Sequence, residues 1–564
     1  MGKKTVAALL CLLLLLSGCG SAAPAQPDAA PEASPSFVPV SAPIYRQERA
    51  PGELPEATVE CLYLTVKEGT TEETDHSWEE INAYSAADYA AMGVERYKIA
   101  GWLQEGTEEG PLGSLEEAPG CTVSFRGQSS STEAQKSYKV KLQNGTWMGQ
   151  KTLNLNKHAT DNSRILNKLA YDLIDEVPQL IGLQTQFVHL FVKDLSQGAD
   201  PETAEFVDYG LYTHVEQLNN QALRRLDLGE DCSLYKVNNF EFWEYDDVKL
   251  TTDPDFNLAN FEVRLENKGA TDNEKLIALM DAVCKGEVSD EELLGRYVEK
   301  ENFAYWMALQ ILLDNVDTCS RNFYLYSPAD GEKWYIISWD NDGAFSHMRA
   351  ELVGFEAVPW RSGVTDYWGS FLFRRLLRIP EFRDALVAAA ADLKENYLTE
   401  EHIRALRDLY TGKTEGILRS SRDESFINWA IREKMLDRIP GEIEAGYARL
   451  LDSLKRPSPY FIGSPQYNAE TGEVLVNWDA SYDFNGQHLT YTVEVTDDPR
   501  FETVLLTRET DENQLTYPHE WGPGTYFLRV TARNEDGYTM GPLNQAWSEE
   551  IGHVFGAQTY AVEG

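Results

Sequence analysis

Residues Ile311–Phe345, ILLDNVDTCSRNFYLYSPADGEKWYIISWDNDGAF, decide the fold that we expect for most of the chain. Their composition predicts the end of an apolar helix, a polar turn and two strands, Phe323–Tyr326 and Trp334–Ser338, which are rich in aromatic and β-branched residues. SPADGE between the strands supplies the Pro, Asp and Gly of a turn. Such a hairpin brings to one end of a sheet three oxygen-bearing side chains that could hold a hard divalent cation: Asp317, Asn322 and Asp340.

The spacing of these side chains is similar to that of a phosphoryl-transfer site. In such a site an Asp accepts the proton of the attacking hydroxyl, an Asn about five residues later binds a metal, and a second Asp beyond a hairpin holds the metal against the phosphates. Asp317 and Asn322 have the Asp-x4-Asn spacing, and Asp340 stands in the later position. Two departures are visible, because Asn315-Val316 precedes Asp317 and Asp340 begins Asp-Asn-Asp. The alternative is that Asp314, Asp317 and Asn322 only cap a helix and shape a turn.

The composition limits the partners that we expect. The chain has 564 residues, of which 91 are acidic and 50 basic, so its formal net charge is −41. The length predicts roughly three domains. Nucleic acid is not an expected partner, because no global basic field is present to neutralise its phosphates. A nucleotide can bind only where local cations and a metal overcome the repulsion.

The N-terminus predicts export. Lys3 and Lys4 precede the apolar run Val6–Leu16, which is too short to span a bilayer comfortably and indicates a signal peptide. The run ends in LSGC, which resembles a bacterial lipobox and implies cleavage before Cys19 and a lipid on its thiol. An ordinary cleaved signal with a chance Cys is the alternative. The following Ser21–Pro43 segment is rich in Ala, Pro and Ser, as in a flexible tether. We therefore expect an extracytoplasmic lipoprotein attached to the cell membrane.

The cysteines of the body do not indicate a metal or disulfide framework. They are five in number and widely spaced, with no CxxC pair, so we expect buried small hydrophobes: Cys61, Cys121, Cys232, Cys284 and Cys319. Cys319 lies in the proposed catalytic loop, but no His is arranged in the sequence to make it a nucleophile.

A basic hairpin stands out in this acidic chain. Strands Thr122–Phe125 and Ser137–Leu142 flank a loop of small hydroxyl residues that begins at Arg126. The period of two in a strand places Lys139 and Lys141 on one face. Backbone N–H groups of the loop, with these cations, could bind phosphate oxygens. Alternatively, the hairpin lies on the surface and its cations point to water.

The same hairpin carries a family resemblance. FRGQSSSTEAQKSYKVKL resembles the Arg-Gly-x-Ser-Ser and Lys-Ser-Tyr-x-x-Lys signature of the spore-coat protein H (CotH) kinase-like family. Further motifs follow in the order of that family, so the resemblance runs over about residues 55–455: Leu153–Asn156, Asp161–Asp172, Gly210–Gln217, Leu234–Lys236, Asp317–Asn322 and Asp340–Asp342.

The resemblance implies an atypical protein kinase that uses ATP with Mg²⁺ or Mn²⁺ and transfers the γ-phosphate to Ser or Thr. It implies that Asp317 is the catalytic base. Asn322 and Asp340 would hold the metal, with Asp342 as a further ligand. The Gly-x-Gly-x-x-Gly loop of ordinary kinases is missing from the sequence, so the mode of phosphate binding is not fixed by it.

Further binding roles come from the same resemblance, each with an alternative. Lys139 or Lys141 would contact the α- and β-phosphates, and the strand period does not choose between them. Glu216 would pair with that lysine or assist a metal, or it is an ordinary acid at the end of a helix or strand. Tyr235 and Trp334 would stack on adenine, or they belong to the core.

The predicted fold class is α+β, with a two-lobed kinase-like domain over residues 55–455. We expect it to follow a signal peptide, 1–18, and a lipidated tether, 19–54, and to contain helices at 276–284, 290–300, 302–313, 370–377, 381–396, 400–410 and 425–454. Residues 456–564 begin with Arg-Pro-Ser-Pro and then alternate short strands with turns, which predicts a small all-β sandwich. It resembles a fibronectin type III-like module, in which we expect a spacer or binding role without chemistry.

The expected function is a surface-anchored kinase that acts on secreted, coat or cell-surface proteins. ATP is scarce outside the cytoplasm, and this favours a rival: a catalytically inactive lipoprotein with the kinase fold that acts in surface binding or structure. Presence of Asp317, Asn322 and Asp340 together favours chemistry, since adhesion needs none of them. A Ca²⁺-stabilised structural protein with a loop at Asp340–Gly343 is a second rival, although the rest of an EF-hand is missing from the sequence.

Overall fold

The computed structural model describes residues 49–115, 117–269, 272–355, 358 and 360–563. The predicted signal peptide, Cys19 and the tether up to residue 48 lie outside the described residues. Within the described ranges, no helix combines the length and the apolar character that crossing a membrane requires.

The first sheet closes on itself. Its strands are β1 (Val59–Lys67), β2 (Ile99–Thr107), β3 (Gly110–Pro111), β4 (Cys121–Arg126), β5 (Ser137–Leu142), β6 (Thr152–Asn156), β7 (Thr185–Asp194) and β8 (Val207–Val215). Their order is β1-β7-β8-β6-β5-β4-β2-β3, and β1 also pairs with β2. This extra pairing makes a barrel, in which β1 and β7 run parallel. Two short helices, α1 (Trp78–Ala83) and α2 (Ala86–Met92), connect β1 to β2.

Successive side chains of each strand point alternately into the barrel and to its outer face. On β1, Leu62, Leu64 and Val66 are fully buried in the barrel core. On β5, Lys139 and Lys141 are exposed and alternate with buried neighbours, so the expected shared face is confirmed. The outer face of β4 and β5 is therefore basic.

The stretch quoted at the outset forms the middle of a second sheet. Its four strands are β9 (Cys232–Val237), β10 (Leu265–Asn267), β11 (Phe323–Pro328) and β12 (Tyr335–Ser338), in the order β10-β9-β11-β12. The predicted hairpin is present, because β11 pairs antiparallel with β12 and Phe323 lies opposite Ser338. All residues of these two strands are buried, which explains why most of them are apolar or aromatic.

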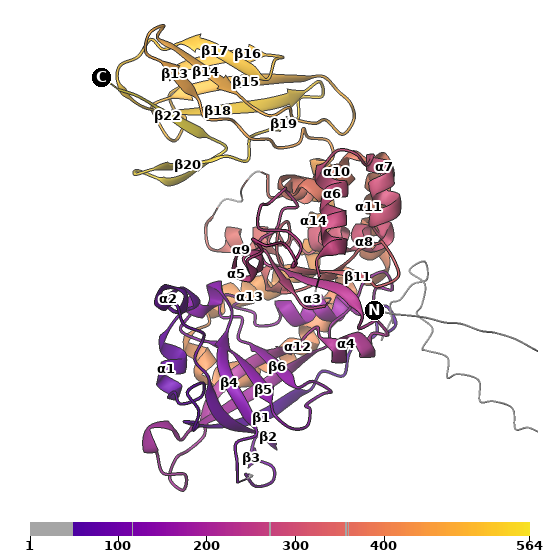
Figure 1. The fold of residues 1–564 in the computed structure, drawn as a ribbon, viewed down its shortest axis with the longest axis vertical. Coiled ribbons are helices and arrows are strands. Elements are labelled where there is room, and N and C mark those ends of the chain that lie inside the picture. Colours follow the sequence, from indigo (N-terminus) through magenta and orange to yellow (C-terminus); the bar gives the residue numbers. More distant parts are fainter. Residues whose placement is uncertain (1–48, 116, 270–271, 356–357, 359, 564) are drawn as a thin grey trace, which may run out of the picture. The chain divides into compact units, whose positions relative to one another are not determined.

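Helices pack on both sheets. They are α3 (Leu166–Ile174), α4 (Asn220–Arg225), α5 (Leu258–Glu262), α6 (Glu274–Cys284), α7 (Asp290–Glu292), α8 (Lys300–Leu312), α9 (Ser346–Leu352), α10 (Phe371–Arg378), α11 (Pro380–Asp392), α12 (Glu400–Ser420), α13 (Trp429–Arg438) and α14 (Glu442–Ser453). For example, α3 packs on β7 and α12 on β8 of the first sheet, and α8 packs on β12 of the second. Figure 1 shows α6, α8, α10, α11 and α14 grouped beside β11. With both sheets, they make a mixed α/β fold, whereas the two-lobed arrangement stays a prediction.

Three predicted helices differ from those observed. The helix expected over 290–300 is the short α7, followed by a π-helical turn, Leu293–Tyr297, and by an extended Val298. The helix expected over 425–454 is interrupted by a 3₁₀ turn, Ile439–Gly441, because Pro440 has no N–H for a continuous helix. The helix expected over 400–410 continues to Ser420 as α12. Pro380 separates α10 from α11 as expected and is the first residue of α11, where a missing N–H costs little.

The C-terminal residues are all β. The strands are β13 (Gln466–Asn468), β14 (Glu473–Asn477), β15 (Leu489–Thr496), β16 (Leu506–Thr510), β17 (Gln514–Pro518), β18 (Gly524–Asn534), β19 (Thr539–Met540), β20 (Gln545–Ser548), β21 (Gly552–Phe555) and β22 (Gln558–Val562). One sheet contains β13, β14 and β17, and another contains β15, β16, β18, β19 and β22. Val476, Val493 and Leu528 come from the two sheets and share one core, as in a sandwich. The domain limits and the fibronectin type III assignment remain predictions.

Candidate functional site

Helix α3 holds the acidic end of the hairpin in place. Asp340 follows β12 with a left-handed backbone (φ 56°), and its N–H donates to the Tyr171 hydroxyl at 3.1 Å. The N–H of Asn341 donates to the Asn167 side chain at 2.9 Å. Both acceptors lie on α3, so the loop that carries the aspartates is fixed by a helix far away in the sequence.

Asp340 and Asp342 are two acids in one partly buried place. Burial and the charge of Asp342 raise the pKa of Asp340 to about 6, although His158 and Arg126 act in the opposite direction. Burial also disfavours a charged Asp342, but a hydrogen bond with His158 Nδ1 at 3.2 Å and the nearby arginines lower the pKa of Asp342. Among the described residues, no hydrogen bond reaches the Asp340 carboxylate. This pair of acids therefore fits a divalent cation, which would neutralise both charges.

Asp317 and Asn322 lie beside this pair. The amide of Asn322 donates to Asp317 Oδ2 at 3.2 Å, and Arg321 Nε is 3.8 Å from Oδ1. Burial and Asp342 raise the pKa of Asp317, yet 55% of its side chain is exposed. In the described part of the chain, Asp317, Asp340 and Asp342 do not place three oxygens within 4.8 Å of one another. Asp317 is thus separate from a common ligand set and accessible to a hydroxyl group.

Cations lie opposite the acids, over the ring of Trp339. The Arg126 guanidinium is 5.8 Å from the centre of the Trp339 ring, and Lys236 Nζ is 5.9 Å from it. Arg126 also donates to the Asn156 side chain. Lys236 was not among the predicted site residues, although it directly follows Tyr235 in a predicted motif. In the structure Tyr235 is fully buried and Lys236 is half-buried, and membership of the Leu-Tyr-Lys motif is the signal that could have identified Lys236.

Lys139 extends this basic surface. Although the Lys139 side chain is exposed, partial desolvation lowers its pKa, and the charges of Lys268, Arg126 and Lys141 lower it further, whereas Glu266 opposes them. Glu266 Oε2 is 2.6 Å from Lys268 Nζ. Four cations from three strands and the residue after β10 therefore act on the same small region: Arg126, Lys139, Lys236 and Lys268.

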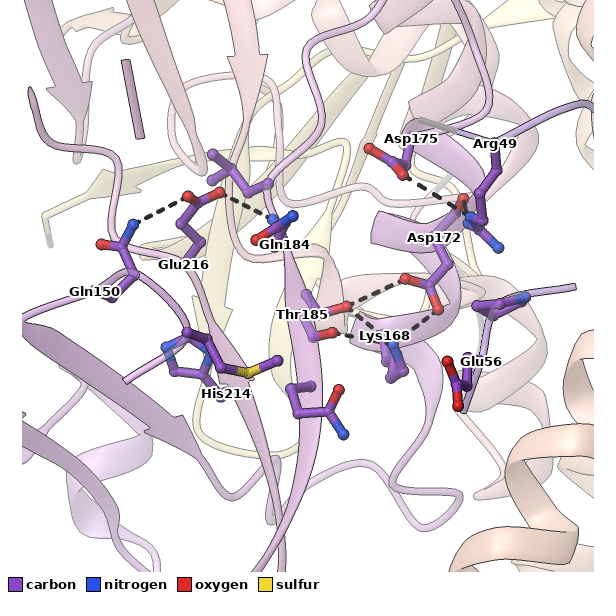
Figure 2. Close-up of a pocket in the computed structure, with 14 residues that line it drawn as sticks. Arg49, Glu56, Gln150, Lys168, Asp172, Asp175, Gln184, Thr185, His214 and Glu216 are labelled. Carbon is purple, nitrogen blue, oxygen red and sulfur yellow. Dashed lines mark hydrogen bonds and ion pairs between the residues drawn. The ribbon is translucent and has the colours of Figure 1, made fainter. Parts of the chain in front are cut away.

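Glu216 has a different partner from the one expected. Gln150 Nε2 and the N–H of Gln184 donate to its two oxygens at 3.0 and 3.1 Å (Figure 2). Arg225 Nη2 of α4 lies 2.6 Å from Oε2. No bond from Glu216 to either predicted lysine of β5 is present in the described residues. Glu216 thus fastens the end of β8 to its neighbours, beside a cavity of about 420 Å³ that is also lined by Lys168 of α3.

The two predicted adenine-stacking rings lie inside the protein. Tyr235 is 0% and Trp334 1% exposed, and their ring centres are 6.1 Å apart. The Tyr235 hydroxyl donates to the Asn273 side chain at 2.9 Å. These positions favour the core alternative for both rings. Cys319 is partly buried, and burial raises the pKa of its thiol to about 12, so it is not an activated nucleophile.

The comparisons with known proteins agree with the predicted resemblance. Inner spore coat protein H of Bacillus subtilis (strain 168) is 21% identical over 230 residues, which are 40% of this chain and 58% of that protein. The match thus spans less than two thirds of that relative's length.

Two solved structures have lower overall similarity. The Helicobacter pylori proinflammatory kinase CtkA has 12% identity and a TM-score of 0.26, covering 56% of this chain and 94% of that one. The extracellular domains d3–d4 of rat CD45 also have 12% identity, with a TM-score of 0.14, covering 19% of this chain and 48% of that one. Neither superposition is close enough to support an argument about the site.

The family comparison covers the site itself. The model of the CotH kinase protein family matches residues 123–433, which are more than half of the 564 residues and include the acidic and basic residues of the site described above. The chain belongs to the CotH kinase protein family.

Proposed function

We propose that this protein is an atypical kinase that transfers the γ-phosphoryl group of ATP to a Ser or Thr hydroxyl of another protein. The observation that carries the proposal is the Asp340 carboxylate, which has no hydrogen bond among the described residues and lies near Arg126, Lys236 and Asp342. A metal–nucleotide complex needs these two kinds of charge side by side, acids for the cation and bases for the phosphates.

The position of each residue in the candidate site indicates its role in the proposed reaction. Asp340, Asp342 and Asn322 hold Mg²⁺ or Mn²⁺, which, when bound, neutralises charge on the phosphates. Arg126 and Lys139 bind phosphate oxygens, and Lys139 is preferred over Lys141 because it shares its surroundings with Arg126 and Lys268.

Asp317 accepts the proton of the attacking hydroxyl. Its side chain is 55% exposed, so an acceptor protein can reach it. Its hydrogen bond with Asn322 orients the carboxylate next to the metal ligands. Burial and Asp342 raise its pKa, which makes it a better proton acceptor than a free aspartate.

The predicted export completes the proposal. With a lipid on Cys19, the protein is anchored outside the cytoplasm, and its acceptor is a secreted, coat or cell-surface protein. The C-terminal sandwich then acts as a fibronectin type III-like spacer or binding module. A surface-binding protein without turnover is the competing function, and the experiment below distinguishes the two.

Calorimetric titration with ATP, with and without Mg²⁺ or Mn²⁺, tests the proposal. We expect metal-dependent binding that Asp340→Ala abolishes and Asp317→Asn retains. Phosphate transfer to a test protein should be lost in both variants. Asp255→Asn is the matched control, since that aspartate is 75% exposed and pairs only with Lys249 among the described residues. Absence of ATP binding with any metal would contradict the kinase and favour the surface-binding protein.

A further inference from the structure

We propose a second divalent-cation site, of the zinc type, on the outer face of the barrel. Its ligands are Cys61 of β1, His189 of β7 and Glu108 of the turn between β2 and β3. Their ligand atoms all lie within 4.8 Å of one another, and no other group of three such side chains meets this limit among the described residues. We call it the Cys61 site.

Strand register brings the three residues together. Cys61 lies directly opposite His189 in the parallel pairing of β1 with β7. Leu62 and Leu64 fill the barrel interior, so the alternate residue Cys61 belongs to the outer face. The turn with Glu108 is held down because the Tyr63 hydroxyl donates to the carbonyl of Thr107 at 2.6 Å.

The separations fit a cation. Cys61 Sγ is 3.5 Å from Glu108 Oε1, and His189 Nδ1 is 3.0 Å from the same oxygen. A tetrahedral Zn²⁺ with bonds of about 2.3 Å to sulfur and about 2.0 Å to nitrogen and oxygen separates S from O by about 3.5 Å and N from O by about 3.3 Å. The two observed separations therefore lie within about 0.3 Å of these values, and the third, between Cys61 Sγ and a ring nitrogen of His189, is within 4.8 Å. The three atoms can thus close around one ion, with the fourth position open.

His189 is oriented as a metal-binding histidine is. Its Nε2 is hydrogen-bonded to Asp208 Oδ1 at 2.8 Å, so the other nitrogen, Nδ1, faces Cys61 and Glu108. The N–H of Gly210 also donates to Asp208 Oδ1, at 2.7 Å, and fixes that carboxylate. The His189 side chain is only 3% exposed. A carboxylate behind a ligating imidazole fixes its tautomer and raises its basicity.

The ligand types select the cation. A thiolate and an imidazole prefer Zn²⁺ or Co²⁺, whereas Mg²⁺ and Ca²⁺ take oxygen ligands. Glu108 is 65% exposed and provides an entry path from solvent. The competing account is a hydrogen-bonded cluster in which a protonated His189 lies between Glu108 and Asp208. That cluster does not need the sulfur of Cys61. Whether Cys61 binds a metal ion therefore decides between the metal site and the hydrogen-bonded cluster.

Cobalt titration of the full chain in excess Mg²⁺ tests the Cys61 site directly. Co²⁺ bound to a thiolate gives a near-ultraviolet charge-transfer band, and we expect one equivalent to produce it and Zn²⁺ to remove it. Cys61→Ser should abolish the band. Cys232→Ser, a change at another buried free cysteine, and Asp340→Ala, in the kinase site, should both leave it intact.

Two further variants keep the test valid if Cys61→Ser misfolds. Glu108→Gln changes an exposed residue and should weaken Co²⁺ binding at least tenfold. Asp208→Asn should weaken it by about 10–100-fold, because the carboxylate behind the histidine is lost. The proposal is overturned if the unmodified protein shows no thiolate band, or if Glu108→Gln and Asp208→Asn bind Co²⁺ as tightly as the parent.

Discussion

Acidification should destabilise this protein through His214. The imidazole is 2% exposed on β8, and its Nε2 finds no hydrogen-bond partner among the described residues. The Trp147 ring lies edge-on, with centres 5.0 Å apart. Burial, and to a smaller extent the charge of Arg126, lower the pKa of His214 from 6.5 to about 3. The folded protein therefore keeps this histidine neutral where the unfolded chain protonates it.

The direction and the magnitude of the effect of His214 on the free energy of unfolding follow from proton linkage. Between pH 6.5 and about 3 the unfolded chain binds one more proton at His214 than the folded protein does. The contribution of His214 to stability is therefore fully present above pH 6.5 and is lost as the pH falls. Each pH unit in that range costs about 1.4 kcal/mol. At pH 5 the loss from His214 is therefore about 2 kcal/mol.

Urea unfolding at pH 7.5 and pH 5, followed by tryptophan fluorescence, measures this loss. We expect the drop in unfolding free energy between the two pH values to be about 2 kcal/mol smaller in His214→Gln than in the parent. The cost of a buried Gln is the same at both pH values and cancels. His488→Gln, at a histidine that is 62% exposed, should behave as the parent does. An equal drop in His214→Gln and the parent would refute the reasoning.

Two further predictions concern buried contacts. Lys157 Nζ lies 2.7 Å from Asp423 Oδ1 with both side chains at most 1% exposed, so Asp423→Asn should lower the unfolding free energy by about 3–5 kcal/mol in urea titrations. A loss below about 1 kcal/mol would contradict a buried ion pair of this strength. Gly446 of α14 packs on α8, where a Cβ would lie 2.5 Å from the Leu312 carbonyl, so Gly446→Ala should lower Tm in calorimetry. Gly416→Ala, in an open part of α12, should instead stabilise by about 0.5–1 kcal/mol, and equal effects of the two changes would oppose this account.

The parts of the fold that the sequence predicted are those with strong local patterns. The hairpin of β11 and β12 was predictable because aromatic and β-branched runs flank a turn with Pro, Asp and Gly. The break between α13 and α14 was visible at Pro440, but the long periodic pattern around it outweighed a single residue in the interpretation. Closure of the barrel was not predictable, because the pairing of β1 with β2 and β7 depends on contacts distant in sequence.

The candidate site also contains some residues whose placement local sequence patterns predict and others whose placement depends on tertiary packing. The proximity of Asp317, Asn322 and Asp340 could be predicted from spacing, since Asn322 and Asp340 flank one end of the hairpin and Asp317 is in the turn just before it. The partner of Glu216 could not be predicted from the sequence, because Arg225 lies on a helix whose packing no local pattern specifies. Lys236 faces the site because of how β9 is placed in its sheet. Aromatic character alone likewise does not separate a stacking ring from a core ring.

The charge of the whole chain and the charge of its site act at different ranges. At physiological ionic strength, screening limits the reach of exposed charges to about 8 Å, so a net charge of −41 spread over the surface has little effect inside a small site. A nucleotide at the proposed site would meet the set Arg126, Lys139, Lys236 and Lys268, opposed by Asp340, Asp342 and Glu266. Without a cation the two aspartates would repel the phosphates, and with one they become part of the attraction. Nucleotide binding should therefore depend far more on the metal than on the overall charge, since the metal reverses the effect of the acids that lie nearest to the phosphates.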